Sequence, residues 1–166
     1  TVAFAKKNKC QLVVSHHPFR MNAEVSMDLS DYENGLIADC IKSGIALYSQ
    51  HTNHDASPES LNHHYLKKLG VESSFPLKPQ GDEAFVGIGA FGDLPKALSK
   101  KDIATKLKGL FKCPTLKWTS HKQKSFKRLA ICTGSGSSLI PEAKACGADL
   151  FITGDVKYHQ AIDAKR

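Results

Sequence analysis

Two adjacent histidines, His16 and His17, end a short apolar run and stand directly before Pro18. Pro18 biases the backbone of His17 toward an extended conformation. Neighbouring side chains of a regular strand point to opposite faces, so both imidazoles can serve one site only where the strand ends and the chain turns. There they could hold two divalent cations, one imidazole on each, and the alternative is a solvated pair in a loop.

A second polar group, the segment 50–55 with the sequence QHTNHD, follows the next apolar run in the same way. The carboxyl ends of neighbouring parallel strands share one edge of a sheet, so we expect His51 and Asp55 to converge there with the histidine pair. Imidazole and carboxylate together suit zinc, iron, manganese or nickel, and a carboxylate can bridge two cations. His54 taken alone is interpreted as an exposed loop residue.

The elements that must position these groups alternate between strand and helix. The first half predicts strands and helices at 11–15, 31–44, 45–49 and 59–70. The order strand, helix, strand, helix favours a parallel sheet with covering helices. Residues 3–10 predict the end of an earlier helix, and Ser57 with Pro58 is expected to cap the helix that contains His63 and His64. These two histidines are interpreted as surface or interface residues.

A polar stretch at 71–84, with two prolines and a glycine, predicts a boundary between a first lobe at 1–79 and a second at 80–166. The second lobe alternates again, with strands expected at 84–92, 127–133 and 149–153 and helices at 99–111, 134–147 and 154–164. The predicted fold class is therefore α/β, with two lobes of mainly parallel strands covered by helices and a cleft between the lobes. Sites in such folds form at the carboxyl ends of the strands.

The positive charge of the 166-residue chain lies in one segment. Residues 96–128 hold 11 Lys or Arg and one acid, Asp102, whereas the rest of the chain holds 12 basic and 15 acidic residues. With Phe111, Trp118 and Phe126 interleaved, the segment could bind nucleic acid through phosphate contacts and base stacking. The apolar spacing favours a different interpretation, with the aromatics in a core, residues 115–120 as a half-buried strand, and the lysines solvated.

Five cysteines, none of them in a Cys-x-x-Cys pair, argue against a disulfide framework or a Cys-type zinc site. Reduced thiols in a cytoplasmic protein are expected instead. No apolar run approaches the roughly 18–20 residues of a membrane span, and no signal peptide opens the sequence. We expect no membrane partner.

The segment 133–138, with the sequence TGSGSS, lies between an expected strand and an expected helix. Its backbone N–H groups at Gly134, Ser135 and Gly136 could contact a phosphate or another anion, because glycine allows close approach and a helix N-terminus favours negative charge. The segment matches neither the dinucleotide-binding pattern nor the P-loop pattern, and a serine-capped turn explains it equally well. No nucleophile elbow surrounds the serines, so serine hydrolase chemistry is not expected.

Four segments together resemble the Nif-three-like family of dinuclear metal-centre proteins, also known as GTP cyclohydrolase I type 2 homologues. The segments are SHHPF, IALYSQHTNHDASPESLN, GIGAFGDL and AICTGSGSSLIPEAKACGADLFITGDVKYHQAIDA. The resemblance extends from about residue 11 to the last residue. It implies a two-lobed α/β fold, assembly into a toroidal homohexamer, and two divalent metal ions in the cleft between the lobes.

Carried over by position, the resemblance implies His16, His17 and Asp55 as metal ligands, with His51 as a further ligand or close neighbour. It also places Lys157, Tyr158 and His159 of GDVKYH near the cleft. The common family sequence HTNLD is HTNHD here, so His54 is an extra imidazole without an assigned role.

Two departures from the family affect this expectation. The family has a further His-x-x-x-Glu motif downstream of the last segment, and the sequence stops at Arg166 without it. His159 and Asp163 have the same spacing but belong to the preceding motif, so the ligand role is not transferred to them. The sequence also starts part-way through the family's first lobe, so the chain looks shortened at both ends relative to the family, and we expect at most three or four protein ligands for two metals.

These expectations lead to two functional hypotheses. The first is a metal-dependent hydrolase of a nucleotide-like or phosphate-bearing small molecule, in which His159 or Lys157 handles protons or substrate anions. The second is a non-enzymatic, ring-shaped scaffold or regulator that binds nucleic acid or a protein partner. The cyclohydrolase label is a family name only, because no residue identifies GTP as a substrate.

Overall fold

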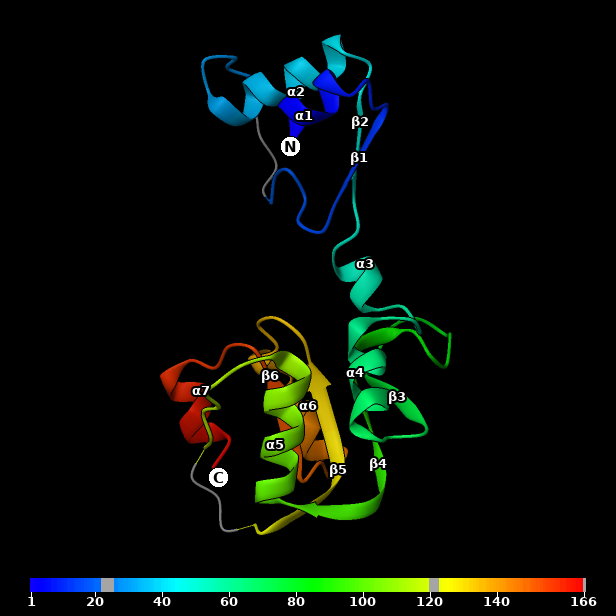
Figure 1. The fold of residues 1–166 in the computed structure, drawn as a ribbon, viewed down its shortest axis with the longest axis vertical. Coiled ribbons are helices and arrows are strands. Elements are labelled where there is room, and N and C mark those ends of the chain that lie inside the picture. The colour runs from blue at the N-terminus through cyan, green and yellow to red at the C-terminus, as the bar shows by residue number, and fades with distance from the viewer. Residues whose placement is uncertain (22–25, 120–122, 166) are drawn as a thin grey trace. The chain divides into compact units, whose positions relative to one another are not determined.

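The computed structural model describes residues 1–21, 26–119 and 123–165 (Figure 1). These residues form two compact units, Thr1–Asn53 and His54–Arg166. The sequence predicts a boundary between residues 79 and 80, but in the structure helix α4 (Leu61–Leu69) and strand β3 (Ser74–Pro79) pack within the second unit. None of the described helices is long and apolar enough to cross a membrane.

The first unit contains helix α1 (Val2–Lys7), strand β1 (Leu12–Ser15), helix α2 (Tyr32–Lys42) and strand β2 (Ala46–Ser49). The two strands pair in parallel, as the alternation of strand and helix predicts, with Ser15 opposite Ser49. Their inner face packs on a small core of buried residues from both helices and the loops. This core contains Val2, Ala5, Cys40 and Ile45, with Val13 and Leu36 packed against it.

The limits of α2 follow from its capping residues. Asp31 precedes the helix and accepts a hydrogen bond from the backbone N–H of Asn34 at 3.2 Å, which satisfies one of the free amides of the first turn. The chain leaves the helix through Gly44 in a left-handed conformation, with φ of 64°. The helix predicted at 31–44 is confirmed and covers Tyr32–Lys42 within that range.

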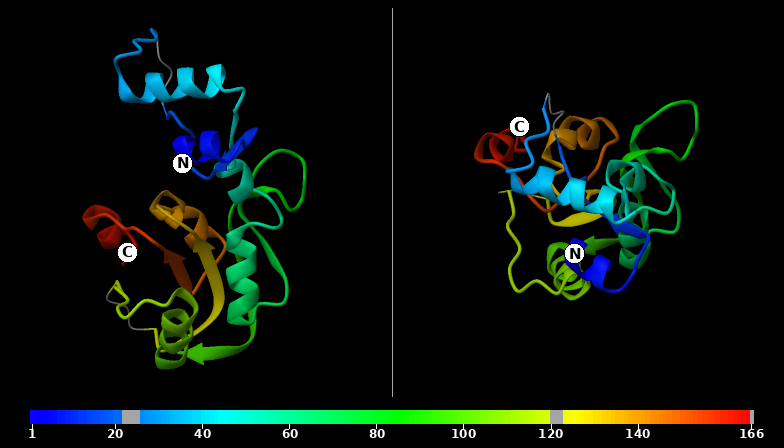
Figure 2. Two further views of the ribbon diagram at one scale, coloured as in Figure 1. Left: turned by 45° about the horizontal axis from the view of Figure 1, so that its top comes forward. Right: turned by 90° about the horizontal axis from the view of Figure 1, so that it is seen from above.

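The second unit is built on a four-stranded sheet in the order β3-β4-β5-β6. Its remaining elements, in chain order, are α3 (Thr52–Asp55), which begins in the first unit, β4 (Gly87–Ser99), α5 (Lys100–Phe111), β5 (Ser125–Cys132), a 3₁₀ turn at Ser137–Leu139, α6 (Ile140–Ala145), β6 (Leu150–Thr153) and α7 (Tyr158–Asp163). Helices α4 and α5 cover one face of the sheet and α6 covers the other (Figures 1 and 2).

Strand β5 lies between β4 and β6, and its side chains contribute to the cores on both faces of the sheet. Leu129 and Ile131 point into the core under α4 and α5, whereas Ala130 and Cys132 point into the core under α6. All four residues are buried, so the strand is a continuous apolar run rather than an alternating one.

The expected α/β class is confirmed, but the second sheet is mixed. Strand β5 pairs with β6 in parallel, whereas β4 pairs antiparallel with both β3 and β5. Strand β3 occupies the stretch predicted to be a boundary, because Pro76 and Pro79 are tolerated on an edge strand that has only one partner. Strand β4 extends beyond the predicted residue 92, and Pro95 falls where its register with β5 shifts.

Two further local predictions are wrong. Helix α4 begins at Leu61 with the buried Ser60 as its N-cap, so Ser57 and Pro58 lie in the preceding turn. Residues 115–119 form no strand; the half-buried Trp118 of this segment packs instead against the core under α4 and α5, and residue 120 lies outside the described residues.

All five cysteines are described and free, as expected.

Candidate metal centre

Three imidazoles meet at one end of the two-stranded sheet. His16 and His17 directly follow β1, and His51 lies two residues after β2. The parallel pairing of Ser15 with Ser49 brings both strand ends to the same edge, as predicted. The three ring centroids are 4.9 to 5.0 Å apart, and one ring nitrogen from each residue lies within 4.8 Å of the other two.

A pair of serine hydroxyls stabilises the turn that brings His16 and His17 to one side. The Ser15 hydroxyl donates a hydrogen bond to the carbonyl oxygen of His17 at 2.8 Å, and Ser49 donates to the same oxygen at 3.5 Å. Because the chain bends here, the rule that adjacent strand residues face apart no longer applies. The serines were not identified from the sequence, although both occupy the last position of an expected strand.

The His16 ring is oriented by the neighbouring strand. Its Nδ1 atom lies 3.0 Å from the carbonyl oxygen of Gln50, which follows β2. A carbonyl can only accept, so this contact requires hydrogen on Nδ1, and in the neutral imidazole Nε2 is then the nitrogen that carries the lone pair. This is the arrangement in which metal-binding histidines are usually held.

The three donors fit a divalent ion. Ligand nitrogens around a tetrahedral zinc stand about 3.4 Å apart, since each Zn–N bond is about 2.0–2.1 Å, and the present separations, all within 4.8 Å, are of the same order. His16 and His17 are exposed and His51 is half-buried, so such an ion would keep positions open to solvent. Three imidazoles with open positions are a donor set of catalytic rather than purely structural metal sites.

Asp55 is the last residue of α3 and belongs to the second unit, so its role as a ligand stays a prediction. His54 is half-buried in the same short helix rather than exposed in a loop. Neighbouring Asn62, fully buried in α4, donates from Nδ2 to the Asp55 carbonyl at 3.5 Å and accepts at Oδ1 from the Thr133 N–H at 2.8 Å. Asn62 thus connects α3 to the end of β5. The sequence does not reveal this role, because a single polar residue in a predicted helix does not indicate its partners.

Burial raises the pKa of the Cys132 thiol, and the negative charge of Asp55 raises it further. This cysteine is the last residue of β5 and lies against the Gly-Ser segment, where a side chain at Gly136 would meet its sulfur. The thiol is therefore held in its neutral form near pH 7, which disfavours it as a nucleophile or metal ligand.

The Gly-Ser segment is occupied by contacts within the protein. The N–H of Gly136, one of the three predicted anion contacts, donates to the Thr153 hydroxyl at 2.9 Å. That hydroxyl donates to the Gly134 carbonyl at 3.1 Å, and the Gly154 N–H donates to the same carbonyl at 2.9 Å. The segment thus serves as a link between β5 and β6, and an anion contact by Gly134 and Ser135 stays a prediction.

The predicted proton-handling residues lie at the start of α7. Lys157 is the N-cap of this helix, and its backbone N–H donates to Gln160 Oε1 at 3.1 Å. Lys157 and His159 are exposed, and the His159 ring contacts the Tyr158 ring at 5.5 Å between centroids. Both belong to the second unit, so their participation in a site with the three histidines stays a prediction.

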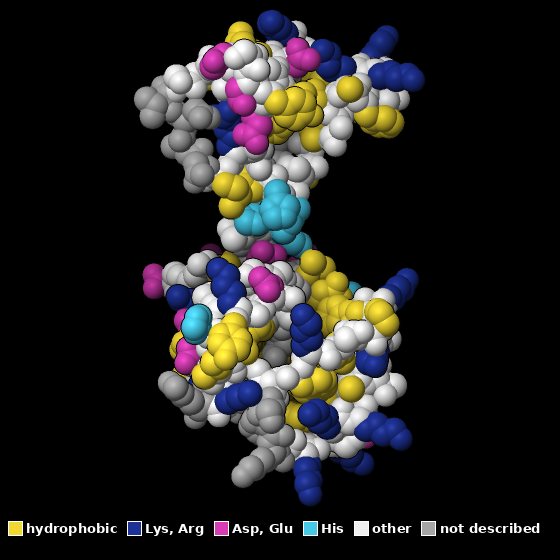
Figure 3. Space-filling view, turned by 90° about the vertical axis from the view of Figure 1, so that its left-hand side faces the viewer, with side chains coloured by type: hydrophobic (Ala, Val, Ile, Leu, Met, Phe, Trp, Pro, Cys, Tyr) yellow, Lys and Arg dark blue, Asp and Glu magenta, His cyan; other side chains and the backbone are white. Residues whose placement is uncertain are grey.

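The aromatic residues of the basic segment are structural. Phe126 is 3% exposed, and Phe111 and Trp118 pack against the core under α4 and α5. The ammonium of Lys100 lies 4.9 Å from the centre of the Trp118 ring and covers part of it. Lys and Arg side chains are spread singly over the face of the second unit in Figure 3. These observations favour the solvated-lysine interpretation over a stacking surface for nucleic acid.

A family model and curated relatives all relate this chain to the same protein family. A model of the Duf34/NIF3 family (NGG1p interacting factor 3) matches residues 1–166. A GTP cyclohydrolase 1 type 2 homolog from Streptococcus pneumoniae is 34% identical over 167 residues, covering 98% of this chain and 62% of that protein. NIF3-like protein 1 of Drosophila melanogaster is 27% identical over 161 residues, covering 96% and 54%.

Solved structures share the fold. A Bacillus cereus protein related to NIF3 matches with a TM-score of 0.79 at 18% identity, covering 98% of this chain and 71% of that one. Reduced HcgD from Methanocaldococcus jannaschii matches with a TM-score of 0.74 at 25% identity, covering 99% and 62%. The chain spans about three fifths of the length of the curated relatives it matches.

Proposed function

Because this chain belongs to the Duf34/NIF3 family, we propose that it binds divalent metal at His16, His17 and His51 and acts as a metal-dependent hydrolase. The proposed substrate is a nucleotide-like or phosphate-bearing small molecule. The observation that supports metal binding is the convergence of three imidazoles from two strand ends, with ring nitrogens within 4.8 Å of one another. Imidazole suits zinc, iron, manganese and nickel, so the metal is named only by class.

A divalent ion bound there would lower the pKa of a coordinated water toward neutrality and polarise a substrate oxygen. The residues of the chain hold and orient the ligands: the Gln50 carbonyl sets the His16 tautomer, and Ser15 with Ser49 holds the backbone of His17. In the full proposal Asp55 adds a carboxylate for a second ion. Lys157 and His159 then bind substrate anions or transfer protons.

The alternative is a non-enzymatic scaffold or regulator that carries the same metal for structural reasons. We propose for either case a cytoplasmic homo-oligomer, a toroidal hexamer by family resemblance. Light scattering on the purified chain measures the subunit number. Turnover of phosphate esters by the metal-loaded protein favours the hydrolase, whereas bound metal without any turnover favours the scaffold.

The direct test is metal content, measured by elemental analysis after dialysis against zinc, manganese, iron or nickel salts. We expect stoichiometric metal in the unaltered chain and its loss in the double variant His16→Ala/His17→Ala. His64→Ala, which removes an exposed histidine from α4, is the matched control and should keep the metal. Equal metal content in the double variant and the control would contradict the proposal.

A further inference from the structure

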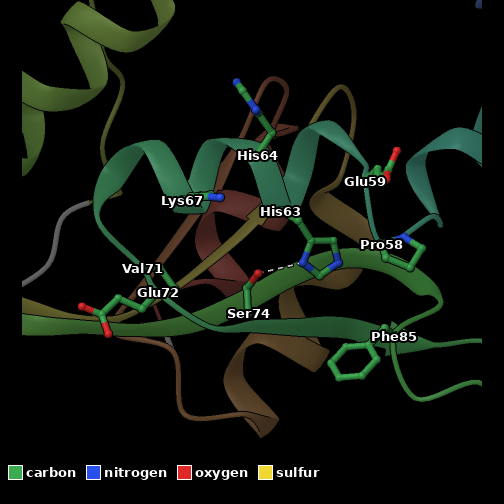
Figure 4. A pocket seen from close by; sticks show the side chains of 9 residues that line it. All are labelled: Pro58, Glu59, His63, His64, Lys67, Val71, Glu72, Ser74 and Phe85. Carbon is green, nitrogen blue, oxygen red and sulfur yellow. Dashed lines mark hydrogen bonds between the residues drawn. The ribbon is translucent and has the colours of Figure 1, made fainter.

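A second site with chemical potential lies entirely within the second unit. An open pocket of about 360 Å³ lies between α4 and the chain that forms β3 and the turn leading to β4 (Figure 4). Its volume is within the range of small-molecule sites. The residues that matter most for its chemistry are Pro58, His63, Lys67, Val71, Ser74 and Phe85.

The side chain of His63 is anchored on one side and unsatisfied on the other. Its Nδ1 atom lies 2.7 Å from the Ser74 hydroxyl, and the ring points from α4 toward β3. Its Nε2 atom is buried and has no hydrogen-bond partner among the described residues. In Figure 4 this nitrogen points toward the space between Pro58 and Phe85. A buried polar atom without a partner is rare in proteins and calls for an explanation.

The His63–Ser74 pair can serve either hydrogen-bonding role. A serine hydroxyl both donates and accepts, so Nδ1 can either accept from Ser74 or donate to it. In the first case Nε2 carries hydrogen and donates into the pocket, and in the second it accepts. The pair therefore adapts to a ligand that offers either a ring nitrogen or a ring N–H.

The remaining lining of the pocket combines apolar side chains with charges of both signs. Phe85 is 52% exposed and stacks on Phe75 at 6.1 Å between ring centroids, with 19° between the ring planes. Lys67 supplies a positive charge, and Glu59 and Glu72 supply negative ones. Burial lowers the pKa of His63, which favours the neutral imidazole. This combination does not favour an anion such as phosphate.

We propose that the pocket binds a neutral, planar heteroaromatic molecule of about nucleobase size, hydrogen-bonded to His63 Nε2 and packed on Phe85. Phe85 offers a face on which a planar ring can stack, and the unsatisfied nitrogen selects a ring that carries a complementary polar edge. This inference does not depend on the metal centre, because the residues involved lie in different units.

The test is titration of the full chain with adenine, followed by calorimetry and by the ¹⁵N shifts of the His63 ring. Benzoate serves as the charged aromatic probe and inorganic phosphate as the anion. We expect saturable adenine binding that moves the Nε2 resonance, and weaker binding of both anions. His63→Phe keeps the ring shape but removes the nitrogen, so adenine affinity should fall about tenfold or more. Lys68→Ala, at an exposed position of the same helix that does not line the pocket, should change it less than twofold.

A loss of binding must be separated from a loss of folding. His63→Phe removes an unsatisfied polar atom but also the hydrogen bond to Ser74, so its melting temperature should change little. Should circular dichroism show that this variant is unfolded, the exposed Phe85→Ser carries the test, with the same tenfold loss expected. Absence of saturable adenine binding, unchanged binding in a folded His63→Phe, or tighter binding of benzoate than adenine would each overturn the proposal.

Discussion

The Nδ1 atom of His16 lies 3.0 Å from the carbonyl oxygen of Gln50, the residue next to His51. The end of β2 therefore orients the imidazole of His16, which follows β1. His16 and His17 follow β1 and His51 follows β2, so the two strand ends carry all three histidines of the cluster. The orientation is independent of any ion, because the acceptor is a backbone carbonyl. The proposed metal centre is in this respect preorganised by the pairing of β1 with β2.

Removal of the serine that holds the turn should weaken metal binding without removing a ligand. Ser15→Ala loses the 2.8 Å hydrogen bond to the His17 carbonyl, so only the longer 3.5 Å bond from Ser49 holds the backbone of His17. We expect about a tenfold loss of zinc affinity in a competition titration with a chromogenic chelator. Ser43→Ala, at an exposed position after α2, should leave the affinity unchanged. Equal affinities in the two variants would show that the turn does not position His17.

Asn62→Ala should destabilise the second unit. The substitution leaves the Thr133 N–H without its 2.8 Å acceptor and also opens a small cavity, because Asn62 is fully buried. A loss of about 2–3 kcal/mol in the free energy of unfolding is expected in urea titrations. The control His64→Ala, on the exposed side of the same helix, should cost less than about 0.5 kcal/mol. A loss no larger than that of the control would mean that Asn62 does not hold β5 in place.

Thr153→Val should loosen the Gly-Ser segment while keeping the shape of the side chain. The hydroxyl accepts from the Gly136 N–H and donates to the Gly134 carbonyl, and valine can do neither. We expect a cost of about 1–2 kcal/mol and faster hydrogen exchange at the Gly136 amide. Thr105→Val is the matched control, since it loses only an exposed bond to the Lys101 carbonyl within α5. Unchanged exchange at Gly136 in Thr153→Val would contradict the assignment.

Stability should depend on pH through Asp149. Burial opposes ionisation of this carboxyl, but hydrogen bonds from the backbone N–H groups of Lys127 and Arg128 and from the Gln123 side chain outweigh it, and its pKa falls below the ordinary 3.8. A lowered folded-state pKa adds stability that is fully present above about pH 4 and is lost as the pH falls through the folded-state value.

Asp149→Asn should therefore cost about 1–3 kcal/mol at pH 7, and the difference from the unaltered chain should shrink below pH 3.8. Urea unfolding at pH 7 and at pH 3 measures both values. Asp82→Asn, in the exposed turn between β3 and β4, should behave like the unaltered chain at both. A difference for Asp149→Asn that stays constant with pH would exclude its charge as the cause.

Capping residues and short apolar runs in the sequence were sufficient to predict most helices and strands. The cap at Asp31 and the stop at Gly44 delimit α2, and apolar runs of four or five residues locate β1, β2 and β6. These sequence signals failed where a contact between distant residues determines the local structure. Proline in the β3 segment predicts a break, yet an edge strand needs hydrogen bonds on one side only. Trp118 packs without a strand because core contacts, not alternation, hold it.

By itself the sequence determined the α/β class, the positions of both histidine segments and their place at strand ends, because these depend on residue type and on spacing along the chain. Only the tertiary structure decided that β3 and β4 run antiparallel and that the Thr153 hydroxyl accepts a hydrogen bond from the Gly136 N–H. It also decided that the unsatisfied Nε2 atom of His63 faces a pocket. Each of these depends on a contact between residues far apart in the chain, and spacing along a sequence carries no record of which distant group satisfies a given donor or acceptor.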